Sequence, residues 1–286
     1  MPEYTGRFAP SPTGPLHMGS LLAALVSYLD ARKNHGQWLV RIEDIDPPRE
    51  QPGATDRILR TLDLHGFHWD REIRYQSACS DLYEATLTKL LDKGLCYACP
   101  CSRKQLDESK GAHLPSCGKY TGKRTDDCAL RFRAQSKTQQ WTDLILGPQK
   151  RSIESDFVLK RRDGLYSYQL AVVADDIDQG ISHVIRGADL CDSTPMQIAL
   201  YRALGVTPPE FGHFPLIVNK DGQKFSKQNF APAVNDQSPM TNLSTLANWL
   251  GLIPPTPAMK SPEDYLAELS KHWELAPLGN KTNYVM

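Results

Sequence analysis

The apolar positions near the start of the chain predict a strand, a helix and a second strand. Residues 6–9 form a short apolar segment that predicts a strand, and the proline-rich residues 10–15 predict a loop. Apolar side chains then recur at helical spacing at Leu21, Leu22, Leu25, Tyr28 and Leu29. The predicted helix ends near Gly36. Residues 38–42 favour a second strand. This order predicts a right-handed βαβ unit, and hence an α/β fold with a doubly wound parallel sheet of Rossmann type.

The same patterns predict further elements along the chain. Two helices are expected over residues 54–65 and 81–94, the second with Asp81 as its cap and Gly94 as its end. A helix from Thr194 to Leu204 is expected to stop at Gly205. Ser261 is a good start for a helix in the tail, and residues 253–257 are typical of a linker. Strands are expected over residues 157–159, 183–185 and 214–218.

Residues 95–142 depart from this alternation. They are rich in Cys, Lys, Arg, Gly and Ser and have weak periodicity, which indicates an inserted subdomain before the α/β pattern resumes. We therefore expect an α/β domain in two halves, an insertion between them, and a short helical C-terminal region. The expected ranges are 1–94 for the first half, 95–150 for the insertion, 151–218 for the second half, and 219–286 for a lysine-bearing loop with C-terminal helices.

Composition narrows the class of protein. The chain has 286 residues, of which 40% are hydrophobic and 23% charged, as in ordinary globular proteins. The formal net charge is zero, so any nucleic-acid surface must be a local patch. The N-terminus lacks the basic and apolar regions of a signal peptide, and no apolar run approaches a membrane span. We expect a cytoplasmic protein with no membrane partner.

The cysteines suggest a metal. Seven are present, and clustered cysteines in a chain without an export signal favour metal over disulfides. Cys99, Cys101 and Cys117 lie within nineteen residues, and a tetrahedral Zn²⁺ site needs a fourth ligand, for which His113 and Tyr120 are the candidates. Buried or free thiols are the alternative. The remaining cysteines are expected to be structural: Cys79, Cys96, Cys128 and Cys191.

Two short motifs suggest phosphate chemistry. His17-Met18-Gly19-Ser20 opens the first helix, where unpaired backbone N–H groups attract phosphate, and His17 can donate a hydrogen bond to it. Lys224-Phe225-Ser226-Lys227 lies in a polar loop able to close over a polyphosphate. Each motif taken alone also has a purely structural interpretation, a packed turn for the first and a solvated surface turn for the second. Together, in this order, they predict attack on the α-phosphate of ATP.

Three motifs resemble those of a known family. The segment GRFAPSPTGPLHMGS over residues 6–20 resembles the amino-terminal signature of glutamyl-tRNA synthetases, which are class I synthetases with a Rossmann catalytic domain. Residues 40–46 resemble the next motif of that family, and residues 224–228 resemble its lysine loop. The resemblance covers the catalytic half of the chain nearly end to end.

This resemblance implies a set of site residues. Glutamate is expected to lie against the segment Arg7, Phe8, Ala9, Pro10 and Ser11, and against Glu43, Tyr168 and Arg186. ATP, with Mg²⁺, is assigned to His17, Gly19 and Lys227, and the catalytic set to His17, Gly19, Lys224 and Lys227. The chemistry agrees, since Arg7 can pair with a carboxylate and Glu43 can accept an ammonium group. Without the family, Glu43 and Arg186 would be ordinary ion pairs and Tyr168 a core residue.

The small relatives of this family carry a zinc site with Cys-x-Cys, Tyr and Cys ligands, and this chain has His113 at the tyrosine position. Imidazole is the better zinc ligand, so the resemblance implies one Zn²⁺ held by Cys99, Cys101, His113 and Cys117.

Only 59 residues follow Lys227, too few for the helical anticodon-binding domain of an ordinary glutamyl-tRNA synthetase. The chain therefore resembles the truncated glutamyl-queuosine tRNA(Asp) synthetases. That family activates glutamate without tRNA and attaches it to the queuosine base at the wobble position of tRNA(Asp). The expected partners are glutamate, ATP and the tRNA(Asp) anticodon stem-loop, bound by a monomer. In the insertion, Lys119, Lys123 and Arg124 are either backbone contacts or a solvated basic face.

Three rival functions remain open at this point. The first is a shortened glutamyl-tRNA synthetase that charges a tRNA 3′ end. The second is a non-catalytic tRNA-binding module, against which the intact His17, Gly19, Lys224 and Lys227 argue. The third is an enzyme that transfers an adenylyl group to make a nucleotide cofactor, which Arg7 and Glu43 disfavour.

Overall fold

The computed structural model describes residues 3–108, 117, 128–135, 137–218, 232–252, 259, 261–280 and 283–285. The βαβ unit expected at the start is confirmed. It consists of β1 (Thr5–Phe8), α1 (Met18–Lys33) and β2 (Gln37–Ile42), and the two strands are parallel with Arg7 opposite Leu39. Asn34 ends α1, and basic Arg32 and Lys33 in its last turn suit the negative end of the helix dipole.

The central parallel sheet reverses its order beside β1. On one side β2 is followed by β3 (Arg74–Tyr75), and the parallel pair β9 (His183–Gly187) and β10 (Glu210–Phe214) lies on the other. The backbone N–H of Ser182 donates to the carbonyl of Thr5 at 3.0 Å, which brings β9 next to β1. In doubly wound sheets a ligand binds beyond the carboxyl ends of the strands at this reversal. The carboxyl ends of β1, β2 and β9 are therefore the expected place for a site.

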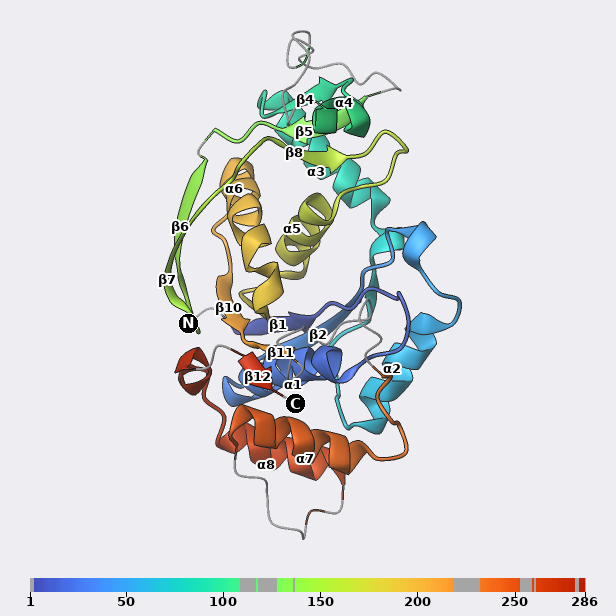
Figure 1. Ribbon diagram of the computed structural model, residues 1–286, viewed down its shortest axis with the longest axis vertical. Helices are drawn as coiled ribbons and strands as arrows, with labels where there is room; N and C mark the ends of the chain where they lie inside the picture. The colour runs from blue at the N-terminus through green and yellow to red at the C-terminus, as the bar shows by residue number, and fades with distance from the viewer. Residues whose placement is uncertain are drawn as a thin grey trace.

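Helices cover both faces of the sheet (Figure 1). One face carries α3 (Ser80–Asp92), α5 (Tyr168–Gln179) and α6 (Thr194–Leu204). The other carries α1, with α7 (Pro239–Leu250) and α8 (Pro262–Lys271) packed beneath it. Consecutive residues of β2 serve both layers, because Trp38 belongs to the α1 core and Leu39 to the α5 core. The remaining long helix, α2 (Ala54–Leu64), adds Ile58 and Leu62 to the α1 core.

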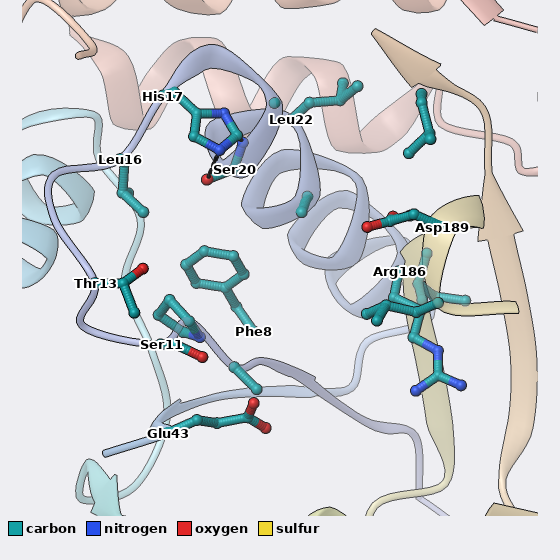
Figure 2. A pocket seen from close by; sticks show the side chains of 18 of the residues that line it. Phe8, Ser11, Thr13, Leu16, His17, Ser20, Leu22, Glu43, Arg186 and Asp189 are labelled. Atoms are coloured by element: carbon teal, nitrogen blue, oxygen red, sulfur yellow. Dashed lines mark hydrogen bonds between the residues drawn. The ribbon is translucent and has the colours of Figure 1, made fainter. Parts of the chain in front are cut away.

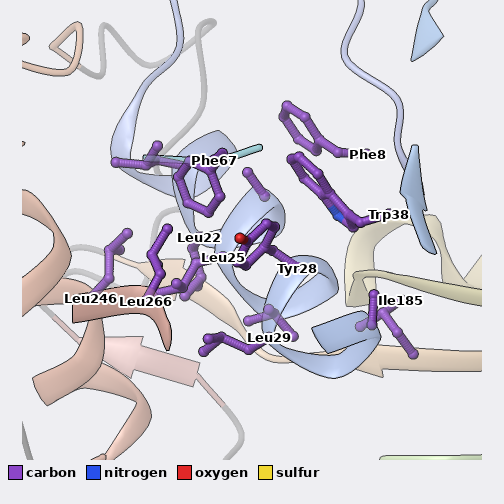
Figure 3. Close-up of a cluster of buried hydrophobic side chains, with 14 of the residues drawn as sticks. Phe8, Leu22, Leu25, Tyr28, Leu29, Trp38, Phe67, Ile185, Leu246 and Leu266 are labelled. Atoms are coloured by element: carbon purple, nitrogen blue, oxygen red, sulfur yellow. The ribbon is translucent and has the colours of Figure 1, made fainter. Parts of the chain in front are cut away.

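Aromatic contacts fix the position of α1 on the sheet (Figure 3). The Tyr28 ring meets the rings of Trp38 and Phe67 edge-on, with centroids 5.1 and 5.3 Å away. Leu25 and Leu29 fill the space between α1 and the two C-terminal helices, where Leu246 of α7 and Leu266 of α8 are fully buried. The C-terminal helices thus stabilise the helix whose first turn faces the site.

A separate antiparallel sheet lies beyond α3 and α5. It contains β4 (Cys96–Cys99), β5 (Ala129–Phe132) and β8 (Phe157–Lys160), with α4 (Arg103–Glu108) beside it. The strand expected at residues 157–159 is present, but the expectation that it returns to the α/β pattern is wrong. It pairs with β5, and the ring centroids of Phe157 and Phe132 lie 5.2 Å apart. A three-residue apolar run does not reveal which sheet it joins.

A hairpin links this sheet to the catalytic half and was not foreseen. It is formed by β6 (Thr138–Asp143) and β7 (Gly147–Ser152). Its turn reaches the central sheet, where the backbone N–H of Leu144 donates to the carbonyl of Phe211 at 2.8 Å. Asp143, at the end of β6, is thereby buried close to β10.

Two helix and strand boundaries differ from expectation for local reasons. Cys79, not Asp81, precedes the first residue of α3, and Asp81 lies in its first turn, where its charge suits the helix dipole. The single strand expected over residues 214–218 is two strands, because Pro215 has no N–H to donate. The second is β11 (Leu216–Val218), which pairs in parallel with β12 (Asn283–Val285).

Other expected boundaries are confirmed. Gly205 ends α6 in the left-handed conformation with φ +79°, and Ser261 caps α8 by accepting from the N–H of Asp264. Short 3₁₀ turns complete the described chain at Pro47–Arg49, Gln76–Ala78, Ala188–Ser193 and Ala276–Asn280. The expected linker at residues 253–257 lies outside the described residues. Within the described chain no helix combines the length and apolarity needed to cross a membrane.

Candidate active site

A pocket of about 480 Å³ opens at the carboxyl ends of β1, β2 and β9, beside the first turn of α1 (Figure 2). In the view of Figure 2, His17 and Glu43 lie at opposite ends of it with Phe8 between them, and Arg186 lies to one side. The pocket brings together all the described residues assigned by resemblance to glutamate and ATP: Arg7, Phe8, Ala9, Pro10, Ser11, His17, Gly19, Glu43, Tyr168 and Arg186. Lys224 and Lys227 lie outside the described residues.

The first turn of α1 forms the His17 end of the pocket. His17 is the N-cap, and its Nδ1 accepts a hydrogen bond from the backbone N–H of Ser20 at 3.2 Å. Gly19 lies on the pocket wall without a side chain to block access to the helix N-terminus. Positive potential from the unpaired N–H groups makes this end suitable for an anion such as phosphate.

The chain on either side of the lysine motif lies next to this helix end. Leu216 of β11 forms part of the pocket wall before the motif. After it, the backbone N–H of Val234 donates to the carbonyl of Leu16 at 2.8 Å, and Ala233 forms a β-bridge with His17. The described residues on both sides of the lysine motif therefore lie beside the pocket.

Arg7 is held from behind by a buried carboxylate. Its Nε donates to Oδ1 of Asp176 at 3.3 Å, and Nη1 of Arg41 donates to the same oxygen at 2.7 Å. Burial alone would raise the pKa of Asp176, but Arg41 and Arg7 together bring it below the usual value. Asp176 is therefore charged, and through Nε it fixes Arg7, which lines the pocket.

Glu43 follows β2 directly and supplies a carboxylate to the pocket. Its Oε1 lies 3.6 Å from Nη2 of Arg41, which is fully buried. Burial raises the pKa of Glu43 to about 7, although the charges of Arg41 and Arg7 act in the opposite direction. Because a cationic ligand would stabilise the charged form, Glu43 suits an ammonium group.

Arg186 lines the pocket and is the first residue of a buried network of polar side chains. Its Nη1 donates to the Tyr168 hydroxyl at 3.4 Å, its Nη2 to Oγ1 of Thr194 at 2.8 Å, and its Nε to Nε2 of His213 at 3.1 Å. On its far side His213 pairs with Asp143 through Nδ1. Burial would raise the pKa of Asp143, yet His213 and backbone N–H groups lower it to about 2. Arg186 is only 4% exposed, so it is not a surface ion pair.

Several of these supporting residues were not singled out from the sequence. Arg41 is a charged residue inside an apolar strand, and Asp175 and Asp176 follow an unbroken apolar run in α5. Such interruptions are a usable signal, because a fully buried charge must have a partner. Asp143 and His213 carry no such signal, since a hairpin brings them together from positions 70 residues apart.

Cys99, Cys101 and Cys117 form a second cluster, in the antiparallel sheet region. Their Sγ atoms all lie within 4.8 Å of one another. Burial, followed by hydrogen bonds and charge from Cys99 and Cys101, raises the pKa of the Cys117 thiol to about 12. A cation among them would reverse this shift by stabilising thiolates. His113 and Tyr120, the candidates for a fourth ligand, lie outside the described residues.

Comparison with known proteins agrees with this arrangement. Residues 3–243 match the family model described as "tRNA synthetases class I (E and Q), catalytic domain". A glutamate tRNA ligase from Elizabethkingia meningosepticum, solved in complex with its amino acid, superposes with a TM-score of 0.80 at 25% identity, covering 99% of this chain and 67% of that one. The glutamate-tRNA synthetase of Elizabethkingia anophelis gives 0.81 at 25% identity, covering 99% and 68%.

Shorter relatives match over nearly their whole length. A protein of Vibrio cholerae named "Glutamyl-Q tRNA(Asp) synthetase" is 46% identical over 280 residues, which is 96% of this chain and 92% of the relative. One of the same name from Neisseria meningitidis is 46% identical over 284 residues, covering 95% and 96%. With the synthetase fold, the pocket at its switch point and these full-length matches, the chain belongs to the family of glutamyl-Q tRNA(Asp) synthetases within the class I tRNA synthetases.

Proposed function

We propose that the protein activates L-glutamate with ATP and transfers it to the queuosine base of tRNA(Asp). The observation that carries this proposal is the pocket in which the buried arginines Arg7 and Arg186 and the carboxylate of Glu43 line the same cavity as the N-terminus of α1. Glutamate has two carboxylates and one ammonium group, and ATP brings phosphate, so each ligand group has an opposite charge available in the pocket. The full-length relatives named for this reaction support the same function.

Glutamate is proposed to bind at the Glu43 and Arg186 side of the pocket. Arg7 and Arg186 would hold the carboxylate of the side chain, since both are buried and both line the pocket. Glu43 would accept the α-ammonium group. The segment from Phe8 to Ser11, with Tyr168, would enclose the ligand. Aspartate is one methylene shorter and glutamine lacks the charge, so this arrangement selects glutamate.

ATP is proposed to bind at the His17 side. The N-terminus of α1, His17 and Gly19 would receive the phosphates, with Lys224 and Lys227 neutralising the polyphosphate together with Mg²⁺. The α-carboxylate oxygen of glutamate attacks the α-phosphorus, the bond from that phosphorus to the bridging oxygen breaks, and pyrophosphate leaves. No protein nucleophile takes part, so the residues act through positioning and charge neutralisation.

Transfer follows from the glutamyl-adenylate. A hydroxyl of the acceptor attacks the activated carbonyl, the carbonyl carbon separates from the phosphate oxygen, and AMP leaves with the hydroxyl proton on a phosphate oxygen. The proposed acceptor is the queuosine of the tRNA(Asp) anticodon stem-loop, bound by a monomer. Because ATP and tRNA are its substrates, the protein would act in the cytoplasm. Residues 95–150, joined by β8 in their antiparallel sheet, would serve as the acceptor-binding insertion between the two catalytic halves, 1–94 and 151–218, with residues 219–286 completing the site.

A zinc ion is proposed for the cysteine cluster. Thiolates bonded to one tetrahedral Zn²⁺ at about 2.3 Å lie roughly 3.8 Å apart, and the three Sγ atoms are within 4.8 Å of one another. Cys99, Cys101 and Cys117 would supply three ligands and His113 the fourth. The ion would join β4 to the segment that precedes β5 and so stabilise the insertion.

Pyrophosphate exchange into ATP, measured without tRNA, tests the activation step. We expect exchange with glutamate and at least about tenfold less with glutamine or aspartate at equal concentration, because the pocket pairs two arginines with a carboxylate at one chain length. Arg7→Lys keeps the charge but removes the planar fork, so it should raise the KM for glutamate. Exchange that required tRNA would contradict the proposal and favour an ordinary glutamyl-tRNA synthetase.

A further inference from the structure

A second, smaller pocket opens from the first on the side of Glu43. Its volume is about 180 Å³, and the two pockets share five lining residues: Ser11, Thr13, Glu43, Arg49 and Tyr168. Its remaining wall is mostly polar and comes from the loop after β2, the turn before α3 and the segment between β8 and α5: Ile45, Asp46, Glu50, Gln76, Arg161, Tyr166 and Ser167. None of these is assigned to glutamate or ATP, so the second pocket has no ligand in the proposed reaction so far.

Gln76, one of the residues that line this pocket, has an unused hydrogen-bond acceptor. The residue is only 1% exposed, and its Nε2 donates to Oδ2 of Asp175 at 2.7 Å. That bond fixes which end of the amide is the oxygen, and Oε1 has no hydrogen-bond partner among the described residues. Asp175 is itself held by the Tyr83 hydroxyl at 2.9 Å, so the amide orientation is set by a buried network. A buried acceptor without a partner costs free energy, which a ligand donor would recover.

Glu50 presents a second acceptor in the same pocket. Its Oε1 is also buried without a hydrogen-bond partner among the described residues. Partial burial and the neighbouring carboxylates of Asp44 and Asp46 raise the pKa of Glu50, which indicates a negative local potential. A donor that also carries positive charge would therefore be favoured next to it.

The arginines of this pocket do not cancel that potential. Nε of Arg49 pairs with Asp46 at 2.5 Å, and Arg161 lies 2.5 Å from Asp163 and 3.8 Å from Asp46. The two cations thus meet the two carboxylates of Asp46 and Asp163. Glu50 remains as the acid of the pocket without an arginine partner among the described residues, and Glu43 stands at the boundary with the first pocket.

We infer that this second pocket is the acceptor subsite, and that Gln76 and Glu50 bind a nucleoside side chain carrying vicinal hydroxyls and a protonated amine. Queuosine has that chemistry, with a cyclopentene diol on a secondary amine. The inference rests on the proposed function. The location of the pocket agrees with this role. With the α-ammonium group of glutamate paired to Glu43, the activated carbonyl carbon is two bonds from that nitrogen and so lies next to the opening between the pockets. A terminal adenosine offers a diol without the cation, so Glu50 would favour queuosine over a tRNA 3′ end.

Two variants test the subsite, with a matched acid as control. Glu50→Gln removes the charge at nearly constant shape, and Gln76→Met removes the amide oxygen. Glu72→Gln makes the same chemical change at an exposed acid that lines neither pocket. For each, pyrophosphate exchange with glutamate is measured beside glutamate transfer to a queuosine-containing anticodon stem-loop RNA.

We expect the ratio of transfer to exchange to fall at least tenfold in Glu50→Gln and Gln76→Met, through a higher KM for the RNA, and to stay within twofold in Glu72→Gln. Because exchange is measured on the same preparation, a misfolded variant is recognised by loss of both activities, and the other variant then decides. Ratios within twofold of the parent protein in both variants would overturn the subsite. A parent protein that exchanges pyrophosphate but does not transfer to this RNA would instead overturn the proposed acceptor.

Discussion

The proton on His213 decides how Arg186 is held. An arginine Nε is always a donor, so Nε2 of His213 must accept from it, and the ring proton must lie on Nδ1 facing Asp143. Burial and the charge of Arg186 lower the pKa of His213, which keeps the ring neutral, although Asp143 acts in the opposite direction. Asp143 is therefore a positioning residue that acts on the pocket through the tautomer of His213.

Asp143→Asn is expected to raise the KM for glutamate about tenfold, which corresponds to a loss of roughly 1.4 kcal/mol in the free energy of glutamate binding. The new amide would donate to Nδ1, move the ring proton to Nε2 and set it against the Nε–H of Arg186. Steady-state pyrophosphate exchange would separate the KM for glutamate from the KM for ATP, which should change less. Asp70→Asn, the same change at a half-exposed pair with Arg32, is the control and should leave the KM for glutamate as it is. An equal rise in both variants would contradict the tautomer account.

Glu43 predicts a pH dependence of glutamate use. With its pKa raised to about 7, Glu43 is charged above neutrality and pairs with the α-ammonium group, whereas below it the carboxyl is protonated and the pair is lost. We expect kcat/KM for glutamate to fall as pH drops below about 7, approaching tenfold per unit. The same profile measured for ATP should be flatter, and Glu43→Gln should remove the inflection. An inflection that persists in Glu43→Gln would assign it to another group.

Sequence reasoning reached the residues of the pocket but not those behind them. Arg7 and His17 follow from motifs because their neighbours along the chain are part of the site. Asp176 and His213 act through contacts across the fold, which no local pattern contains. A charged residue within an apolar strand, as at Arg41, is the part of this network that physical reasoning about sequence does reveal.

At the scale of elements, the turn after α2 depends on close contact with α8. Gly66 has φ +76°, and a Cβ there would lie 2.7 Å from the backbone nitrogen of Glu263. Gly94, at the turn after α3, has a similar φ of +68° but nothing within 4 Å. Alanine at either position would therefore bear a similar backbone strain. At position 66 alone, its methyl group would also clash with the start of α8.

Gly94→Ala is expected to lower the free energy of unfolding by about 1 kcal/mol, the cost of a left-handed conformation for an L-residue. Gly66→Ala is expected to lose about 3 kcal/mol, because α8 must also shift away from the added methyl group. Chemical denaturation of both variants measures the difference. Equal losses would show that the contact between the α2 turn and α8 yields without cost.

The cysteine cluster predicts a metal content for the insertion. We expect about one zinc per chain by elemental analysis, clearly less in Cys117→Ser, and still about one in Cys79→Ser, since Cys79 lies outside the cluster. Because the ion would order the segment between β4 and β5, its loss should lower glutamate transfer to RNA more than pyrophosphate exchange. A parent protein without bound zinc, or equal zinc in both variants, would contradict the site.

For the whole molecule, the elements of the catalytic half and the presence of an insertion were predictable, but the strand pairing within the insertion was not. Apolar periodicity and turn residues identify β1, α1, β2 and α6 because each buries a face against the central sheet. The pairing of β8 and the hairpin of β6 and β7 escape this reasoning, since they depend on tertiary contacts with β5 and β10. That hairpin matters, because it delivers Asp143 to the network behind Arg186.

Transfer of radiolabelled glutamate to three RNAs tests the proposed activity most directly. The RNAs are tRNA(Asp) with queuosine, the same tRNA with guanosine at that position, and tRNA(Glu). We predict label on the first alone, recovered in the anticodon fragment after nuclease digestion. Label at the 3′ end of tRNA(Glu), or equal label on tRNA(Asp) with and without queuosine, would contradict the account.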